Sequence, residues 1–477
     1  MSAAVDSAVA AAADERPQGA EPEPWPIRGV RLGVALSVAA AFASLVRDAP
    51  VLMGPRGLAP AAPLLARLAE RVDSPFLRLP TLFHWLDASD GNLRALAILG
   101  VVGCVGLAFR RGAWVAWPLA FLYLSFANAG TTFFTFQWDA LLVETLAILP
   151  ALGRGRLGTW LVWWLLFRLN LQSGLAKVLW SDDWTSLRAM GAYWQTAPLP
   201  TPLAWWAHQL PAPLQQGLTA GTLAIECVLP FLLPWRRARP WIFAVWTSLQ
   251  LGILATANYG SFNWLTLALQ LSLLAPATGA GQGRSGVGVR VLAASIVPLS
   301  LVVFANRFGP DRPFDDLAGL AQRWRVTNAY HLFASIDPVR DEVELIGSDD
   351  ARTWAPLPLA HKPAEPMAWL APYHPRVAFS LWFYTLGGRD TPVGLRVAAP
   401  GFVARLVERW CTDPARLTPL LTHAVSAPRY VSLRFWRATF AADRVGWDRQ
   451  ELGRHPTVYD CASGDIPAFV QVEALVR

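Results

Sequence analysis

The sequence has little charge and none of the short motifs by which many enzymes are identified. Charged residues make up 16% of the 477 residues, whereas a soluble chain of this size carries about a quarter. It contains no GxSxG, HExxH, GxxxxGK[ST] or GxGxxG string, and its seven histidines lack metal-ligand spacing. The sequence therefore predicts no metal site and no cofactor.

Lysine is nearly absent, so the net charge of +7 comes from arginine; the lysines are Lys177 and Lys362. The arginines stand in short clusters between apolar runs and form neither a basic face nor a basic tail. That distribution argues against a nucleic-acid partner. Together with abundant alanine and proline, it is typical of a GC-rich bacterial genome.

Hydrophobic residues make up 54% of the chain and form runs of near-spanning length. A helix needs roughly 20 residues to cross the hydrocarbon core of a bilayer. We predict a polytopic α-helical membrane protein that contacts membrane lipids, with a transmembrane domain over residues 26–306. About nine spanning helices are expected, at 29–46, 92–109, 113–129, 133–152, 157–180, 214–234, 240–257, 261–276 and 288–306.

Arginine clusters in the short connections predict the orientation. With a cytoplasmic N-terminus, the cytoplasmic connections carry Arg110/Arg111, Arg154/Arg156, Arg236/Arg237/Arg239 and Arg284/Arg290. The opposite connections, at 129–132 and 258–260, contain no Lys or Arg. This positive-inside pattern, with an odd number of spans, predicts that residues 307–477 lie on the non-cytoplasmic side. Residues 1–25, Ala-rich and acidic, are expected to form a disordered cytoplasmic tail.

Two longer segments, 48–91 and 181–213, are predicted to be outward loops, the first with an interfacial amphipathic helix at 61–72. The C-terminal 307–477 is predicted to be a β-rich, sandwich-like extramembrane domain. Its expected elements are strands at 343–347, 353–359 and 429–440 and a short helix at 402–411. Spacing alone leaves open whether Cys411 and Cys461 form a disulfide there.

Ionisable residues within the spanning runs are the candidate catalytic groups, because buried charge in a membrane is costly. The fourth and fifth runs are joined by a short loop at 152–156, so they should form an antiparallel pair. Counting from that loop places Glu144 and Arg168 at the same depth, which predicts an ion pair. Asp139 and Lys177 are expected in the same polar cluster, nearer the outer surface.

Other polar or aromatic residues in or beside the runs are candidate binding residues: Gln137, Trp138, Gln172, Trp205, His208 and Glu226. Two interpretations of the polar cluster stay open. It either locks helix packing through satisfied opposite charges or lines an outward cavity in which Lys177 acts as a base. The residues do not decide whether the protein is an enzyme.

Several local strings, in this order, resemble the lipase maturation factor family. They are FQWDALLVET at 136–145, 167–177 with Trp184, PLPTPLAWWAHQLP at 198–211, 225–231, NYGSFNWLT at 258–266, 343–354, and 373–376 ahead of Trp382. The chain departs from the family pattern at Gln195, where a glutamate is usual, and at Asn170, where an apolar residue is frequent.

This resemblance implies a membrane factor that assists folding or assembly of secreted lipases or other exported clients, with its C-terminal domain in the lumen or periplasm. It implies the cytoplasmic membrane of a bacterium, or the endoplasmic reticulum of a eukaryote. The family is also distantly similar to the membrane helices of the vitamin K-dependent carboxylase. That similarity keeps an alternative open, an integral membrane enzyme acting on a lipid or secreted protein.

Overall fold

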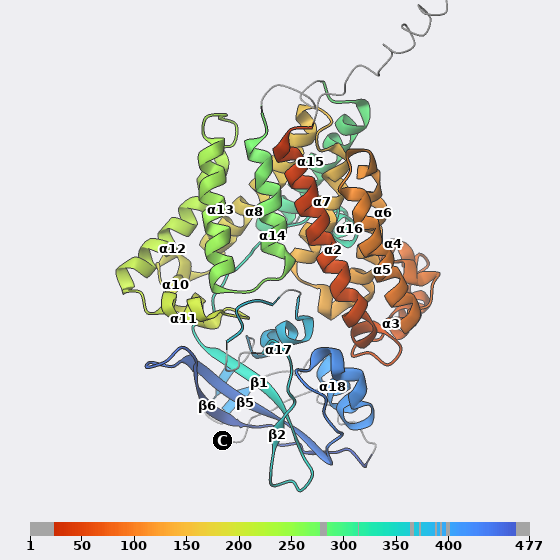
Figure 1. Ribbon diagram of the computed structural model, residues 1–477, viewed down its shortest axis with the longest axis vertical. Coiled ribbons are helices and arrows are strands. Elements are labelled where there is room, and N and C mark those ends of the chain that lie inside the picture. The colour runs from red at the N-terminus through yellow and green to blue at the C-terminus, as the bar shows by residue number, and fades with distance from the viewer. Residues whose placement is uncertain are drawn as a thin grey trace, which may run out of the picture.

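The computed structural model describes residues 23–276, 284–312, 314–362, 367–371, 374–386, 389–391, 394–396 and 401–463. A helical bundle stands at one end of the molecule and an antiparallel sheet with two helices at the other (Figure 1). The predicted tail at 1–25 falls almost wholly outside the described residues, which begin at residue 23.

Each of the nine apolar runs contains a helix within the described residues. These helices are α2 (Trp25–Met53), α5 (Asp90–Leu107), α6 (Ala116–Ala129), α7 (Gln137–Ile148), α8 (Arg156–Trp180), α12 (Ala212–Cys227), α13 (Arg239–Thr256), α14 (Ser261–Gln270) and α15 (Val287–Phe308). Three of them, α2, α5 and α15, are long and apolar enough to cross a membrane by themselves. Short 3-10 turns lengthen α12 and α14, at Leu229–Leu232 and Leu271–Leu274.

Shorter helices occupy the predicted outward segments: α3 (Ala61–Arg71), α4 (Pro75–Arg78), α9 (Asp182–Thr185), α10 (Ala189–Thr196) and α11 (Pro202–His208), with α16 (Asp315–Trp324) following the bundle. The amphipathic helix predicted at 61–72 corresponds to α3, of which only Ala61 and Leu65 are buried. Helix α2 continues through Pro50 and takes up the first residues of the segment predicted as a loop from residue 48.

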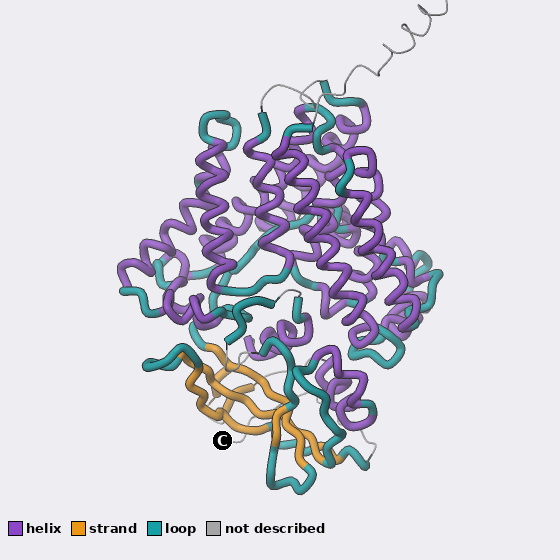
Figure 2. Tube along the Cα trace, in the orientation of Figure 1, coloured by secondary structure: helices purple, strands orange, loops and turns teal. Residues whose placement is uncertain are grey.

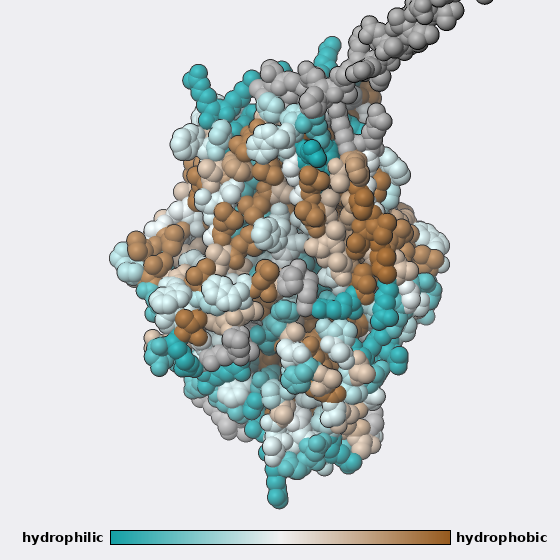
Figure 3. Space-filling view, viewed as in Figure 1, coloured by the Kyte–Doolittle hydropathy of each residue, from teal (hydrophilic) through white to brown (hydrophobic). Residues whose placement is uncertain are grey.

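Apolar side chains cover the outside of the bundle. Figure 3 shows them gathered over its middle on one face, with hydrophilic side chains at both ends. Those that are at least half exposed on α2, α5, α13 and α15 include Leu36, Val102, Val105, Trp241, Leu251 and Val291. An apolar surface of this extent is stable against lipid and not against water, as expected of a membrane protein.

The C-terminal part is built on one antiparallel sheet (orange in Figure 2). Its strands, in the order β2-β1-β5-β6 with β7 also paired to β5, are β1 (Arg340–Ser348), β2 (Ala355–Pro356), β5 (Tyr430–Phe440), β6 (Trp447–Arg454) and β7 (Tyr459–Asp460). A separate pair joins β3 (Arg389–Thr391) to β4 (Gly394–Arg396). Strands β1 and β5 pair along their length, from Arg340 opposite Ala438 to Ser348 opposite Tyr430.

The turn between β1 and β2 is held by Asp350. Its carboxylate accepts hydrogen bonds from the backbone N–H groups of Thr353 (2.7 Å) and Arg352 (2.8 Å). These bonds stabilise the charged form and lower the pKa of Asp350 to about 2. The residue therefore stays ionised, and the turn stays capped, throughout the physiological pH range.

The prediction of a sandwich-like domain is wrong for the described residues, where helices α17 (Arg376–Leu386) and α18 (Gly401–Thr412) pack on the sheet. The ring of Tyr384 in α17 lies 6.0 Å from that of Phe435 in β5. Trp410 of α18 packs so closely on β1 that a Cβ at Gly347 would lie 2.8 Å from its ring. The helix α17 was missed because its residues are nearly all apolar and carry no helical periodicity.

The structure contains a disulfide between Cys411 at the end of α18 and Cys461 beyond β7. It ties the helix that covers the sheet to the last described strand. Since the bond closes a loop of 50 residues, restricting the unfolded chain should stabilise the folded domain by roughly 4 kcal/mol.

We therefore predict that Cys411→Ala lowers the free energy of unfolding of the C-terminal domain by roughly 4 kcal/mol. Thermal unfolding of the purified protein, followed by tryptophan fluorescence and by limited proteolysis, measures the loss. Reductant should reproduce it in the wild type and have no further effect on Cys411→Ala. A wild-type melting curve that is indifferent to reductant contradicts the prediction.

Candidate functional site

The predicted ion pair between Glu144 of α7 and Arg168 of α8 forms at the centre of the bundle. The exposed fraction of the two side chains is 0% and 4%. Helices α7 and α8 are joined by a short connection, which fixes their antiparallel register and brings the two residues level. Burying such a pair is favourable only when further hydrogen bonds satisfy its remaining polar atoms.

Those hydrogen bonds come from residues 325–333, here called the strap, which follow α16 and return into the bundle. The carboxylate of Glu144 accepts from the backbone N–H (3.0 Å) and the side chain (3.0 Å) of Asn328 and from the hydroxyl of Tyr330 (2.8 Å). Arg168 donates to the hydroxyl of Thr327 (3.1 Å) and to the carbonyl of Asn328 (3.1 Å). The ion pair thus holds the strap in the bundle through these hydrogen bonds.

Other polar side chains of the bundle hold the next residues of the strap. The amide oxygens of Gln172 and Gln137 accept from the backbone N–H groups of Tyr330 and His331, each at 2.8 Å. Lys177 donates to the carbonyl of Leu332 (2.7 Å), and the indole of Trp184 donates to that of Phe333 (2.9 Å). A run of backbone without secondary structure is tolerated at this depth because the bundle supplies its hydrogen bonds.

Asp139 has a different partner from the one expected. It forms a bidentate ion pair with Arg376, the first residue of α17, at 2.8 and 3.0 Å. It also accepts a hydrogen bond from the hydroxyl of Tyr123 at 2.6 Å. Arg376 also donates to the carbonyl of Phe133 (2.7 Å) and lies 3.8 Å from the ring of Phe134. This fully buried contact joins α17 to α7, 237 residues apart in sequence.

Lys177 pairs with Glu226 of α12 at 2.6 Å and not with the Asp139 region. Gly174, one turn earlier on α8, permits this approach, since a Cβ there would lie 2.6 Å from the sulfur of Cys227 and 2.9 Å from the Cβ of Glu226. The expectation that Asp139 and Lys177 share one cluster is therefore corrected. Each is neutralised by a separate partner from a segment far away in sequence.

A third contact joins the outward segment 181–213 to the sheet. Arg340 of β1 donates to the carbonyls of Gln195 (3.0 Å), Ala197 and Pro198 (2.9 Å). It is fully buried, and although burial lowers the pKa of Arg340 below its ordinary value, the partner Glu342 at 2.8 Å opposes this effect. The amide oxygen of Gln195 accepts from the N–H of Phe440 in β5 at 3.0 Å.

Trp205 and His208, two of the candidate binding residues, lie in α11 against the end of the same sheet. The indole of Trp205 donates to the carbonyl of Ala441 (2.8 Å), and the ring of His208 lies 5.4 Å from that of Phe440. Both side chains therefore help to dock the outward segment on the C-terminal domain.

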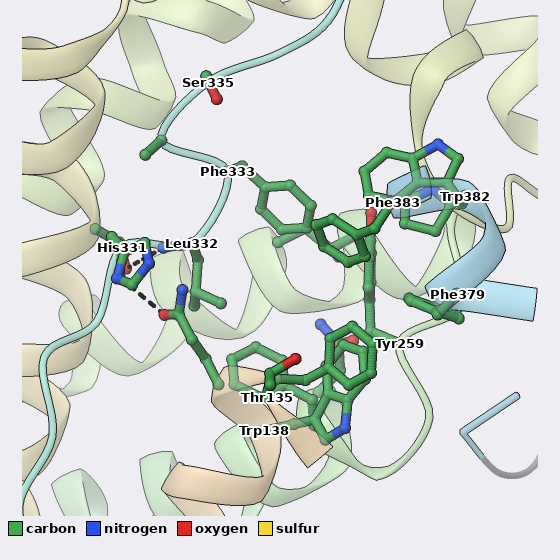
Figure 4. A pocket seen from close by; sticks show the side chains of 18 of the residues that line it. Thr135, Trp138, Tyr259, His331, Leu332, Phe333, Ser335, Phe379, Trp382 and Phe383 are labelled. Carbon is green, nitrogen blue, oxygen red and sulfur yellow. Dashed lines mark hydrogen bonds between the residues drawn. The ribbon is translucent and has the colours of Figure 1, made fainter. Parts of the chain in front are cut away.

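A cavity of about 790 Å³ lies between the bundle, the strap and α17. Figure 4 shows His331, Leu332 and Phe333 of the strap on one side, Phe379, Trp382 and Phe383 of α17 on another, and Trp138 with Tyr259 between them. Further lining residues come from the membrane helices: Gln137, Leu169, Asn170, Ser173, Glu226, Leu249, Gln250, Ile253, Phe262 and Asn263. The four candidate catalytic residues Asp139, Glu144, Arg168 and Lys177 are not part of this described lining.

Glu144, Arg168 and Asp139 were thus identified from the sequence. Their partners, the strap and Arg376, were not, and neither was Arg340. The available signal was Asp139, which had no opposite charge level with it on the neighbouring helix. A buried carboxylate without a partner implies one from elsewhere in the chain. Among the arginines of the C-terminal part, Arg376 stood out by its place in the family-like string 373–376, which did not indicate a partner in the bundle.

The fold and the site together define a helical membrane protein whose C-terminal sheet domain is fastened to its bundle by buried charged and polar residues. The model of the lipase maturation factor transmembrane domain matches residues 28–279. The chain belongs to the lipase maturation factor family.

Individual relatives agree with this assignment. Lipase maturation factor 2 of Gallus gallus is 36% identical over 51% of this chain and 37% of its own length. Lipase maturation factor 1 of Bos taurus is 28% identical over 70% of each protein, and that of Homo sapiens is 26% identical over 85% of this chain and 82% of its own length. The chain thus covers less than two fifths of the length of lipase maturation factor 2 of Gallus gallus and of Mus musculus. No solved structure matches the chain.

We predict that Glu144→Leu lowers the free energy of unfolding by roughly 3–5 kcal/mol, because it leaves Arg168 buried without its counter-charge. Arg168→Leu should have a similar effect. The double variant should recover part of the loss, since neither charge then remains. Melting temperature in detergent and the amount of protein in the membrane are the measurements.

The matched control is Glu70→Leu on the exposed side of α3, which should change stability by no more than about 0.5 kcal/mol. Losses that simply add in the double variant would show that Glu144 and Arg168 do not act as a pair.

Proposed function

We propose that this protein is a membrane-embedded maturation factor that assists folding or assembly of secreted lipases or other exported proteins. The observation that carries the proposal, beside the family membership, is the state of the four candidate catalytic residues. All four are buried, paired with charges of the same chain and outside the described lining of the cavity. Charges used in this way support a rigid platform and count against the enzyme alternative.

The proposed platform spans the membrane nine times, with a cytoplasmic N-terminus and a C-terminal domain on the outer side. A helix in each of the nine apolar runs supports the number. The turn between α12 and α13, which carries an arginine cluster, lies at the end of the bundle away from the sheet (Figure 1), as the positive-inside rule requires. The disulfide in the C-terminal domain fits an oxidising compartment.

In terms of domains, we propose a cytoplasmic tail at 1–25, a membrane domain at 26–306 and an outer domain at 307–477. The contacts of the strap add that residues 325–333 pack within the membrane domain. In a bacterium the protein would lie in the cytoplasmic membrane and its outer domain in the periplasm.

Fusion reporters test this topology. Alkaline phosphatase fused after residue 463 should be active, because the enzyme requires an oxidising compartment, whereas the same reporter inserted at 236–239 should be inactive. Green fluorescent protein at the two positions should give the opposite result. Active phosphatase at 236–239 would overturn the proposed orientation.

The exposed aromatic surface of the outward segment is the proposed client contact. Trp206 of α11 is 60% exposed although its neighbour Trp205 is buried. A large apolar side chain held on a fixed helix can bind transiently to the unburied core of a folding chain. Its place between the membrane and the sheet suits a client that has just been exported.

We predict that deleting the gene lowers the specific activity of a co-expressed secreted lipase several-fold while the amount of lipase protein falls less. Trp206→Ala should reproduce part of the defect without changing the level of the membrane protein. Activity and immunoblot of the secreted fraction are the measurements.

Trp241→Ala is the matched control, because Trp241 is 74% exposed at the start of α13, on the proposed cytoplasmic side. It should leave lipase maturation unchanged. Normal specific activity of the lipase in the deletion strain would contradict the proposed function.

A further inference from the structure

The cavity between the bundle and α17 is open at its outer end. Among its lining residues, Thr132, Thr135, Ser335 and Phe383 are exposed. From this mouth it reaches inward to Asn170 of α8 and Gln250 of α13. Gln250 lies six residues before the outer end of its helix, a depth of about 9 Å at 1.5 Å per residue. The cavity therefore extends from the outer membrane surface into the apolar layer.

Five buried polar atoms of the lining have no hydrogen-bond partner among the described residues: the indole nitrogen of Trp138, the amide oxygen of Asn263, Nδ1 of His331 and the hydroxyls of Ser380 and Tyr384. Trp138, Asn263, Ser380 and Tyr384 are only 8%, 0%, 6% and 4% exposed, and His331 is partly buried. Unpaired polar atoms at this burial are rare, since each costs about 1–3 kcal/mol. The indole and the two hydroxyls can donate, the oxygen of Asn263 accepts, and Nδ1 of His331 does either according to its tautomer. This set suits a ligand with hydroxyl or carbonyl groups.

The charge of the lining limits the kind of headgroup. Glu226 is the ionisable carboxylate that reaches the cavity, and Lys177 neutralises it at 2.6 Å. No unpaired cation is found in the described lining. A phosphate or carboxylate headgroup would thus be buried without a counter-charge, at a large cost in free energy. A neutral polar group meets no such cost.

The walls of the cavity suit an aliphatic chain. They are formed by Leu169, Leu249 and Ile253 of the membrane helices and by the rings of Phe262 and Phe379. The volume of about 790 Å³ lies within the range of small-molecule sites, roughly 300–1,000 Å³. A peptide would require partners for the backbone polar groups of each residue, whereas the five unpaired atoms suffice for one headgroup.

We propose that this cavity binds one neutral single-chain membrane lipid of the monoacylglycerol type. The acyl chain lies along Leu249 and Ile253, and the glycerol hydroxyls and ester carbonyl bond to the unpaired atoms of Asn263, Ser380 and Tyr384. Because the walls come from both the bundle and α17, a bound lipid stabilises the contact between the two domains. This site goes beyond the proposed function and requires no lipase client.

Binding of radiolabelled 1-oleoylglycerol to the full-length protein in detergent micelles tests the proposal. We expect saturable binding of one molecule per chain, together with a rise in melting temperature. Leu249→Trp places a large ring in the cavity and should weaken binding at least about tenfold. Leu251→Trp, the same exchange on the exposed side of α13, should leave binding unchanged.

Ser380→Ala removes one unpaired hydroxyl and little volume, and should weaken binding several-fold. It gives a second answer if Leu249→Trp fails to fold. Equal binding by wild type, Leu249→Trp and Ser380→Ala would overturn the site.

Competition distinguishes the ligand classes. Unlabelled oleate and lysophosphatidylcholine should displace the probe at least about tenfold less well than 1-oleoylglycerol. If either displaces it equally well, the neutral headgroup is wrong. If an acetylated Phe-Trp-Leu amide peptide displaces it better than the lipid, the cavity is a peptide site and the proposal fails. None of these readouts involves a lipase, so they stand or fall separately from the proposed function.

Discussion

The buried pair of Glu144 and Arg168 is the constraint on which the arrangement of the protein depends. Two charges in the middle of an apolar bundle are stable only when their other polar atoms are also bonded. The bundle itself does not provide those bonds; Thr327, Asn328 and Tyr330 of the strap do. The membrane domain therefore needs a segment of the following domain in order to complete its own centre.

Two further contacts make this dependence mutual. The first residue of α17, Arg376, finds its counter-charge in Asp139 of the bundle, and Arg340 of β1 holds the backbone at Gln195–Pro198. The three contacts lie on different elements, so they fix the C-terminal domain in both position and rotation. The cavity has walls from the bundle helices α7, α8, α12, α13 and α14, from the strap and from α17, and it can keep a defined shape only because of this fixation.

Local information was sufficient for part of this structure. The apolar runs gave the helices, and the short connection between α7 and α8 gave the depth of Glu144 and Arg168. The strands at 343–347 and 429–440 followed from alternation. The partners of Asp139 and Lys177 could not be predicted from local patterns, because Arg376 and Glu226 lie 237 and 49 residues away in the sequence. Contacts between distant elements depend on chain topology, which side-chain periodicity does not encode. The cavity is lined by residues of several elements far apart in the sequence, so the sequence did not predict it either.

The two departures from the family pattern can now be judged by what their side chains do. Gln195 stands where a glutamate is usual, yet the bond from the N–H of Phe440 requires only an acceptor oxygen, which the amide retains. Since Arg340 binds the backbone carbonyls around Gln195 and has Glu342 as its counter-charge, no second carboxylate is needed there. Asn170 donates to the carbonyl of Leu166 on its own helix and faces the cavity. The first change preserves the contact between the domains, and the second adds a polar side chain at the inner end of the proposed lipid site.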